Sequence, residues 1–251
     1  MTIVVDVQNK TYPSRTPGQD HIALTEVAFE IPESQFTCIV GPSGCGKSTL
    51  LNIVSGLEKG FEGTVSINGE SPEKAHIGYM FQTPRLMPWL SVLDNVRLVM
   101  DNSEEEEELA RHLLEEMHLG DVLQAFPNRL SGGMQRRVAL ARAFVVQPGL
   151  LLMDEPFISL DEPAAIRLRQ VLLNLWNERP TTVLFVTHDL SEAIYLADRI
   201  LFLSPGPGRI VLDYKVPLTR PREDLEKKDI EALKSELLDK HPDLLTGLAE
   251  N

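Results

Sequence analysis

Residues 41–49 read Gly41-Pro42-Ser43-Gly44-Cys45-Gly46-Lys47-Ser48-Thr49, and they fit the phosphate-binding loop pattern G-x-x-x-x-G-K-[ST]. Such a loop joins a strand to a helix. The flanking sequence agrees, because an apolar run typical of a strand precedes it at residues 36–40 and a helix-forming run begins at residue 49. The motif and its context together favour a phosphate-binding loop over a chance glycine turn beside a surface lysine.

The backbone of this loop is suited to bind anions. Its successive N–H groups can turn inward, and the following helix adds unpaired N–H groups and the positive end of its dipole. We expect Lys47 to reach the β- and γ-phosphates and the Ser48 hydroxyl to bind Mg²⁺. The sequence therefore predicts a nucleoside triphosphate site with contacts from Gly41, Pro42, Ser43, Gly44, Cys45, Gly46, Lys47, Ser48 and Thr49.

The composition is that of an ordinary soluble globular protein. The 251 residues carry a net charge of −13, which argues against the basic face that nucleic acid binding needs. No apolar run approaches the roughly 18 residues that span a bilayer, and the chain starts without a signal sequence. Cys38 and Cys45 are too few for a disulfide framework. We expect a cytoplasmic α/β protein with no nucleic acid partner.

Short apolar runs predict strands at residues 3–7, 28–31, 63–69 and 77–81. Pro17 and Gly18 mark a turn-rich segment between the first two. Residues 63–69 alternate with a period of two and end in an Asn-Gly turn, which is typical of a hairpin. The run at residues 77–81 ends next to Gln82. Tyr12 has two interpretations, either a packed strand aromatic or a ring that stacks on the nucleotide base.

Helical signals replace the strand signals from residue 83 to residue 128. Helices are predicted over residues 91–100 and 103–118, and Ser103 with Glu106 forms an S-x-x-E capping box. This segment is interpreted as a helical insertion in an α/β core.

A second helix start follows at Ser131-Gly132-Gly133, where a serine N-cap precedes bare backbone. It presents a further set of N–H groups to an anion. Two phosphate-directed helix starts in one chain are explained if each serves the nucleotide of a partner subunit.

Functional side chains follow two more apolar runs. Residues 150–153 lead into Asp154-Glu155, and residues 181–187 lead into His188. The carboxyl ends of parallel strands are where such sheets bind ligands. Asp154 can therefore hold Mg²⁺, Glu155 can orient or deprotonate a water, and His188 can donate a hydrogen bond to a γ-phosphate.

With these motifs in order, the chain resembles the nucleotide-binding subunit of an ATP-binding cassette (ABC) transporter over roughly residues 3–218. The resemblance rests on the phosphate loop together with the A-loop aromatic Tyr12, the Q-loop Gln82, the signature at residues 130–135, the Asp154-Glu155 pair, the D-loop Asp161 and the switch His188. It implies an α/β fold: a P-loop NTPase (RecA-like) core with a mainly parallel sheet, an N-terminal antiparallel β portion and an inserted α-helical subdomain.

The resemblance also implies domain limits. Residues 1–218 would form the nucleotide-binding domain, with the helical insertion at about 83–130, and residues 219–251 would form a C-terminal helical tail. In that tail Ile230, Leu233 and Leu237 share one helical face, which we expect to pack on the domain.

The implied mechanism uses two cassettes, most simply a homodimer, arranged head to tail around MgATP. Glu155 would be the general base and His188 would stabilise charge on the γ-phosphate, while Lys47 binds the phosphates and Gln82 senses Mg²⁺ and the attacking water. The metal would be held by Ser48, Gln82 and Asp154. The other cassette would contribute Ser131, Gly132, Gly133, Gln135 and Asp161.

Residues 81–92 and 204–210 are similar to the ATPases of bacterial nitrate, sulfonate, taurine and bicarbonate importers. This similarity implies a membrane permease as partner, with its coupling helix on residues 83–128, and a solute-binding protein as an indirect partner. The protein would be peripheral on the cytoplasmic face of the inner membrane.

Two stretches depart from the family pattern. The signature helix reads Gln135-Arg136 where the family more often has a basic residue before the glutamine, and the D-loop reads Ile158-Ser159 rather than Ser-Ala. Rival interpretations are a soluble cassette ATPase, a coiled-coil DNA-maintenance ATPase and a non-catalytic subunit. The soluble cassette ATPase is disfavoured because such proteins resemble two fused cassettes and this chain has one phosphate loop. The DNA-maintenance ATPase is disfavoured because the chain lacks a long heptad region, and the non-catalytic subunit because Lys47, Glu155 and His188 are intact.

Overall fold

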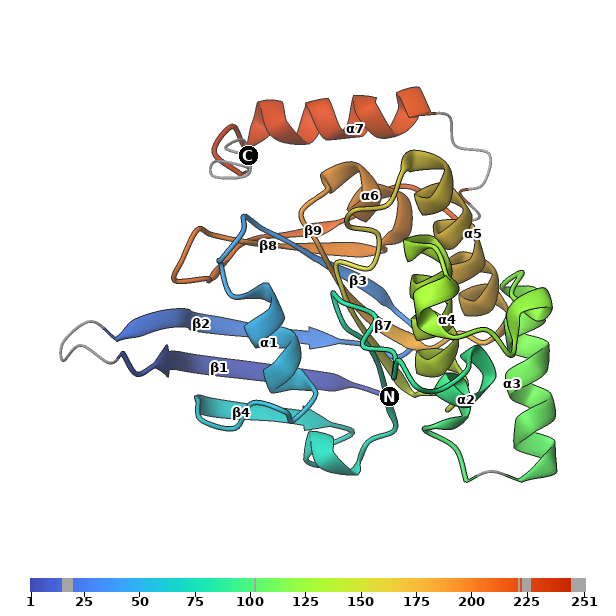
Figure 1. Ribbon diagram of the computed structural model, residues 1–251. Helices are drawn as coiled ribbons and strands as arrows, with labels where there is room; N and C mark the ends of the chain where they lie inside the picture. The colour runs from blue at the N-terminus through green and yellow to red at the C-terminus, as the bar shows by residue number, and fades with distance from the viewer. Residues whose placement is uncertain (15–19, 102, 221, 223–226, 245–251) are drawn as a thin grey trace. The chain divides into compact units, whose positions relative to one another are not determined.

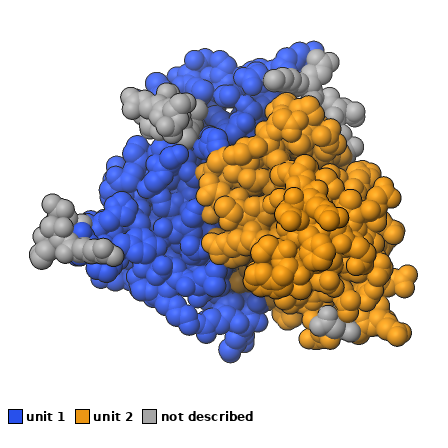
Figure 2. Space-filling model, viewed as in Figure 1, with its two compact units in different colours: residues 1–75, 182–251 blue, residues 76–181 orange. Residues whose placement is uncertain are grey.

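The computed structural model describes residues 1–14, 20–101, 103–220, 222 and 227–244 (Figure 1). The chain divides into two compact units, which Figure 2 colours separately. Unit 1 comprises Met1–Ala75 and Thr182–Asn251, and unit 2 comprises His76–Thr181. The predicted turn residues Pro17 and Gly18 lie outside the described residues.

An antiparallel sheet in unit 1 has the strand order β2-β1-β4, with β1 at Ile3–Tyr12, β2 at His21–Ile31 and β4 at Glu62–Ile67. Alternate side chains of β1, at Ile3, Val5 and Val7, are buried. This is the period-two pattern of a sheet with one covered face. The predicted N-terminal antiparallel portion is confirmed.

The Asn68-Gly69 pair forms the tight turn predicted after β4, but the hairpin that it closes is limited to one bridge. Asn68 has φ 55° and Gly69 has φ 76°, as an Asn-Gly turn requires. The antiparallel bridge joins Ile67 and Glu70, whose backbones exchange hydrogen bonds of 2.9 and 3.1 Å. The extended pairing of β4 is with β1, where Val65 lies opposite Val5.

The phosphate loop belongs to a mainly parallel set of strands in unit 1: β3 Phe36–Val40, β7 Thr182–Thr187, β8 Arg199–Leu203 and β9 Ile210–Lys215. β3 pairs in parallel with both β7 and β8, and its side chains are buried throughout, as expected of a strand covered on both faces. β9 pairs antiparallel with β8. It is not among the predicted strands, because its side chains are at most half-buried and the apolar pattern is weak.

The helices of unit 1 include α1 Lys47–Val54, α6 Leu190–Leu196, α7 Lys227–Lys240 and the short 3₁₀ helix Pro72–Lys74. α7 packs against α6 (Figure 1). Its predicted apolar stripe is confirmed, since Leu233 and Leu237 are buried and Ile230 is half-buried.

Unit 2 contains two parallel strands and several helices: β5 Ile77–Met80, β6 Leu150–Asp154, α2 Val92–Arg97, α3 Glu104–Glu116, α4 Gly132–Phe144, α5 Glu162–Glu178 and the 3₁₀ helices Gly120–Val122 and Pro127–Arg129. Every side chain of β6 is buried, as its apolar run predicts. The predicted helical insertion is present as α2 and α3.

Both helices of the insertion start at serine N-caps, and the one at Ser103 is the cap that the sequence predicts. Ser91 accepts a hydrogen bond from the backbone of Asp94, and Ser103 forms the predicted capping box with Glu106. α2 is shorter than the predicted range 91–100. The Asn95 side chain has no exposed surface. Its amide accepts a hydrogen bond from the Met87 N–H and donates to the carbonyl oxygens of Met87 and Leu90, so it holds the loop before α2 in place.

α5 is not among the predicted helices, although local signals mark it. Asp161 is its N-cap residue, Pro163 lies in its first turn, and Ala165, Leu168 and Leu172 are buried at helical spacing. The fold class is nevertheless confirmed: an α/β protein with mainly parallel strands, an antiparallel N-terminal sheet and inserted helices. None of the helices in the described part of the chain is long and apolar enough to cross a membrane.

Candidate functional site

The phosphate loop closes tightly against the strand β2. Gly46, the N-cap of α1, has φ 97°, a conformation that favours glycine. A Cβ at this position would lie 2.6 Å from Leu24 Cδ2 and 2.8 Å from the carbonyl oxygen of Ala23. Both the backbone angle and the lack of space therefore require glycine at the last position before Lys47.

Lys47 is held inside the loop. Its side chain is 5% exposed, and Nζ donates to the carbonyl oxygens of Gly41 at 2.8 Å and Pro42 at 3.0 Å. These bonds place the ammonium group at the centre of the loop. Part of the loop faces solvent, namely Ser43, Gly44 and Ser48. The arrangement presents N–H groups, a hydroxyl and a positive charge around one small volume, which suits a phosphate chain.

His188 and the phosphate loop leave the same edge of the sheet. Val40 and Thr187 are paired residues of the parallel strands β3 and β7, and Gly41 and His188 follow them directly. The turn at His188 is well supported, because the Thr187 hydroxyl donates to Glu192 at 2.6 Å and accepts from the Asp189 N–H at 3.0 Å. The exposed His188 side chain therefore starts one strand away from the phosphate loop.

Tyr12 lies beside the helix that follows the phosphate loop. Its hydroxyl is 3.2 Å from the Glu58 carboxylate and 3.5 Å from the Thr49 hydroxyl. Lys10 Nζ stands 4.4 Å from the ring centroid and donates to Glu58 at 2.8 Å. This hydrogen bond is the main reason why the pKa of Glu58 is lowered. One face of the ring is therefore covered by the ammonium, so a base could stack only on the other face.

The parallel strands β5 and β6 bring Gln82 and the Asp154-Glu155 pair to the same edge of unit 2. Met80 pairs with Met153, and these paired positions are followed by Gln82 and by Asp154-Glu155. Asp154 is 6% exposed. The pKa of Tyr79 is raised, mainly because the Tyr79 side chain is buried and secondly because the negative charge of Asp154 disfavours a phenolate nearby. Glu155 has φ 44°, a left-handed conformation that non-glycine residues adopt mainly at functional or strained positions.

The signature and the D-loop share a cavity of about 230 Å³ in unit 2. Ser131 is the N-cap of α4 and accepts a hydrogen bond from Met134 N–H at 3.2 Å. The predicted residues in the lining are Ser131, Gly132, Gly133 and Asp161, and Arg137 and Arg167 line it as well. Backbone N–H groups and two guanidinium groups around one hollow suit an anion.

Gln135 is placed differently from the other signature residues. Its Nε2 donates to the carbonyl oxygens of Pro127 at 3.0 Å and Leu130 at 3.4 Å. The amide thus holds the loop that precedes α4. A contact between Gln135 and a nucleotide stays a prediction.

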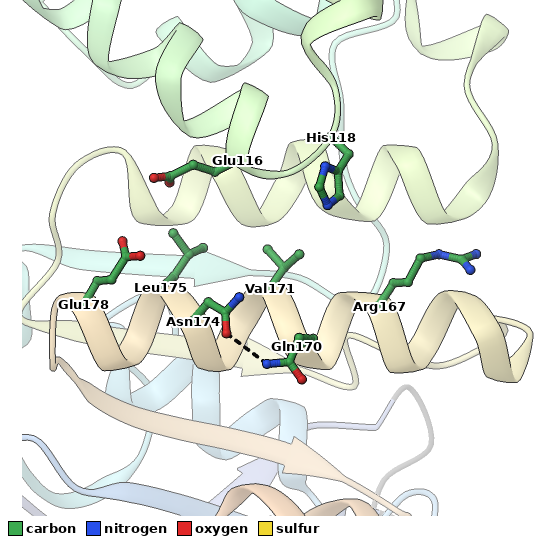
Figure 3. Close-up of a pocket in the computed structure, with 8 residues that line it drawn as sticks. All are labelled: Glu116, His118, Arg167, Gln170, Val171, Asn174, Leu175 and Glu178. Atoms are coloured by element: carbon green, nitrogen blue, oxygen red, sulfur yellow. Dashed lines mark hydrogen bonds between the residues drawn. The ribbon is translucent and has the colours of Figure 1, made fainter. Parts of the chain in front are cut away.

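A larger cavity, of about 320 Å³, lies between α5 and the end of α3 (Figure 3). Its lining mixes both charges with amides and apolar groups: Glu116, His118, Arg167, Gln170, Val171, Asn174, Leu175 and Glu178. None of the predicted site residues lines it. The mixed lining does not point to any one ligand.

Sequence reasoning missed the role of Gly208 beside the phosphate loop. A Cβ on this glycine would lie 2.0 Å from the carbonyl oxygen of Cys45. The turn of residues 204–210, which the sequence marks only as a subfamily signal, therefore packs directly on the loop backbone. In the sequence, Gly208 itself was the signal that could have indicated this contact, because a glycine often marks a place where two backbones approach closely.

The chain matches the ABC transporter family over residues 24–158. It is 41% identical over 222 residues to the aliphatic sulfonates import ATP-binding protein SsuB 2 of Burkholderia cenocepacia, a match that covers 88% of this chain and 82% of that protein. It is 46% identical over 201 residues to SsuB of Zymomonas mobilis, covering 79% and 82% of the two chains.

The fold is also similar to a solved dimeric structure of the ATP-binding cassette MJ0796 in a post-hydrolysis state bound to ADP and Pi. That similarity has a TM-score of 0.76 at 34% sequence identity, and it covers 87% of this chain and 100% of the other. The matched residues include the phosphate loop, Gln82, the signature and the Asp154-Glu155 pair. The chain therefore belongs to the ABC transporter family and is one of its ATP-hydrolysing subunits.

Proposed function

We propose that this ATPase powers uptake of a small anion or small organic solute through a membrane permease, with aliphatic sulfonates as the first solutes to test. The observation that carries the proposal is the high identity, over most of the chain, to proteins named for sulfonate import. A solute-binding protein would deliver the solute to the permease. The subunit would work on the cytoplasmic face of the inner membrane.

The phosphate loop, Tyr12 and His188 are assigned to ATP itself. Lys47 exchanges its carbonyl partners for the β- and γ-phosphates, since a charged acceptor binds an ammonium group more strongly than a neutral carbonyl does. The adenine base stacks on the face of Tyr12 that Lys10 does not cover. His188 donates a hydrogen bond to the γ-phosphate. The remaining loop residues, from Gly41 to Thr49, supply backbone N–H groups and hydroxyls.

We assign Mg²⁺ to the oxygen donors Ser48, Gln82 and Asp154, because the ion prefers hard oxygen ligands and the phosphates of its nucleotide. When bound, the ion supplies positive charge that neutralises the phosphates. Asp154 is 6% exposed and ends β6, at the carboxyl end of a parallel strand, where such sheets bind their ligands. Glu155 accepts a proton from the attacking water.

The cavity at the signature takes the triphosphate bound by a second cassette. The Ser131 hydroxyl and the N–H groups of Gly132 and Gly133 would meet the γ-phosphate, and Asp161 would lie along the seam between the subunits. A second copy of this chain is the simplest partner. We assign residues 1–218 to the nucleotide-binding domain, residues 83–130 to its helical insertion and residues 219–251 to a C-terminal tail.

Replacement of Glu155 by glutamine tests the catalytic assignment. Glu155→Gln removes the base but keeps the size of the side chain, so ATP binding should persist while turnover falls by about 10² or more. The stalled protein should form an ATP-bound dimer, visible by size-exclusion chromatography with MgATP. Glu162→Gln, at an exposed glutamate in the first turn of α5, is the matched control and should keep turnover. Unchanged turnover in Glu155→Gln would remove Glu155 from this role.

A further inference from the structure

The unusual order Gln135-Arg136 places an arginine inside unit 2. Arg136 lies in the second turn of α4 and is 8% exposed. Its Nη1 donates to the carbonyl oxygen of Pro156 at 2.9 Å and to that of Gln82 at 3.2 Å. Burial lowers the pKa of the guanidinium, and the two carbonyl groups compensate for part of the lost hydration.

The two acceptors belong to the two catalytic segments of this unit. Gln82 follows the end of β5, and Pro156 follows Glu155 directly at the end of β6. The peptide that Arg136 binds is therefore next to the left-handed Glu155, at φ 44°. Such a conformation persists only where its surroundings determine it. A single nitrogen atom of the signature helix thus contacts the backbone on which Gln82 and Glu155 depend.

We propose that Arg136 is a positioning residue, which ties Gln82 and the Glu155-Pro156 peptide to the signature helix and so keeps both side chains in the geometry that hydrolysis needs. The proposal rests on the roles assigned above to Gln82 and Glu155. Because α4 starts at the signature, any shift of the helix start on binding ATP would be carried by this contact to the base and to Gln82.

The simpler interpretation is that Arg136 only stabilises the packing of α4. The same helix offers a matched control, Arg142, whose Nη2 and Nη1 donate to the carbonyl oxygens of Pro84 at 2.7 Å and Arg85 at 3.0 Å. Burial lowers its pKa as well. Arg142 thus binds the same segment after β5, whereas the hydrogen bonds to the Gln82 and Pro156 carbonyl groups come from Arg136. A purely structural role predicts similar effects at both positions.

The test compares Arg136→Met with Arg142→Met in the full chain, by thermal unfolding and by the ATP dependence of hydrolysis. We expect both variants to lower Tm. Only Arg136→Met should lower kcat, by about 10-fold or more, because misplacement by about 1 Å can cost on the order of 10². Its KM should stay within about 3-fold, since the phosphate loop is untouched. Equal losses of kcat in the two variants, or a raised KM at unchanged kcat, would overturn the proposal.

Lysine variants cover the case in which a methionine variant does not fold. Arg136→Lys keeps the charge but cannot reproduce the guanidinium geometry. It should therefore show a partial loss of kcat that Arg142→Lys does not show, and equal rates would again overturn the proposal. The unaltered protein and Glu155→Gln distinguish a failure of the positioning role of Arg136 from a failure of the proposed function. If Glu155→Gln abolishes turnover and Arg136→Met does not, only the positioning role fails; if the unaltered protein does not hydrolyse ATP, the proposed function fails.

Discussion

At the scale of single residues, close backbone contacts determine the shape of the phosphate loop. Gly46 leaves room for Leu24, and Gly208 leaves room for the Cys45 carbonyl. The turn that contains Gly208 is further fixed to β2, because Gly208 N–H donates to Ala23 and its carbonyl accepts from Thr25 N–H. The loop is thus enclosed by backbone from β2 and from the segment before β9, and side chains at these contacts would displace it.

Gly208→Ala should weaken ATP binding. The added Cβ would lie 2.0 Å from the Cys45 carbonyl oxygen, a distance that forces one of the two backbones to move. We expect KM for ATP to rise by about 10-fold or more, since displaced N–H groups lose charge-assisted hydrogen bonds to phosphate worth roughly 1.5–3 kcal/mol each. ATP-dependent hydrolysis or direct titration measures this effect.

Gly206→Ala is the matched control in the same turn. A Cβ there would meet the Gly44 carbonyl oxygen at an ordinary 3.6 Å, so KM should stay near that of the unaltered protein. An unchanged KM in Gly208→Ala would mean that the turn does not control the loop.

At the scale of elements, the side chain of Arg222 caps the end of α6. Arg222 is 3% exposed, and its Nη1 donates to the carbonyl oxygens of Ile194, Tyr195 and Ala197, while Nη2 donates to Leu218. Burial, together with the positive charge of Arg220, lowers the pKa of Arg222 to about 10, so the side chain stays charged at neutral pH. A cation at a helix C-terminus also interacts favourably with the helix dipole.

Arg222→Met should destabilise the protein strongly. The change leaves buried carbonyl groups of α6 without their donor, and each buried unsatisfied group costs about 1–3 kcal/mol. We expect the free energy of unfolding to fall by at least about 2 kcal/mol in urea titrations. Arg209→Met, at an exposed arginine in unit 1, should change it by less than about 0.5 kcal/mol. Equal stabilities of the two variants would contradict the capping role.

At the scale of the whole molecule, the helical insertion exposes several large apolar side chains. Trp89 is 70% exposed, and other exposed apolar residues in the same insertion are Leu98, Val99 and Phe126. The loop that carries Trp89 is held in place by the buried amide of Asn95. Large aromatic side chains such as tryptophan are enriched among the residues that contribute most to protein interfaces. The permease is the partner that we assign to it.

Trp89→Ala should weaken the complex with the permease while leaving the basal ATPase rate unchanged. The measurement is isolation of the tagged chain from native membranes in mild detergent, followed by identification of its partners and assay of ATPase activity. Val211→Ala, at an exposed valine of β9, is the control and should keep the permease. Full recovery of the permease with Trp89→Ala would contradict this docking surface. Recovery of the unaltered chain only with ribosomes, DNA or no partner would overturn the transport assignment.

The elements that were predicted correctly are those with local signals. The buried strands β3, β6 and β7 are continuous apolar runs, and α3 and α4 begin at serine caps. β9 was missed because an edge strand with half-exposed side chains has a weak pattern. The turn predicted after β4 is present, but its hairpin ends after the single bridge between Ile67 and Glu70, because a turn motif determines the turn and not the length of the strand that follows it. The partner of β4 over most of its length, β1, is distant in sequence and has no local signal.

The sequence by itself determined the family, the ATP chemistry and the candidate residues, because the phosphate loop, the caps and the polar ends of apolar runs are each encoded within a few consecutive positions. Only the tertiary structure decided how those residues are supported. Arg136 lies 54 positions from Gln82, and Lys10 lies 48 positions from Glu58. Contacts across such separations leave no local signal, since they depend on which strands pair and which helix faces are buried.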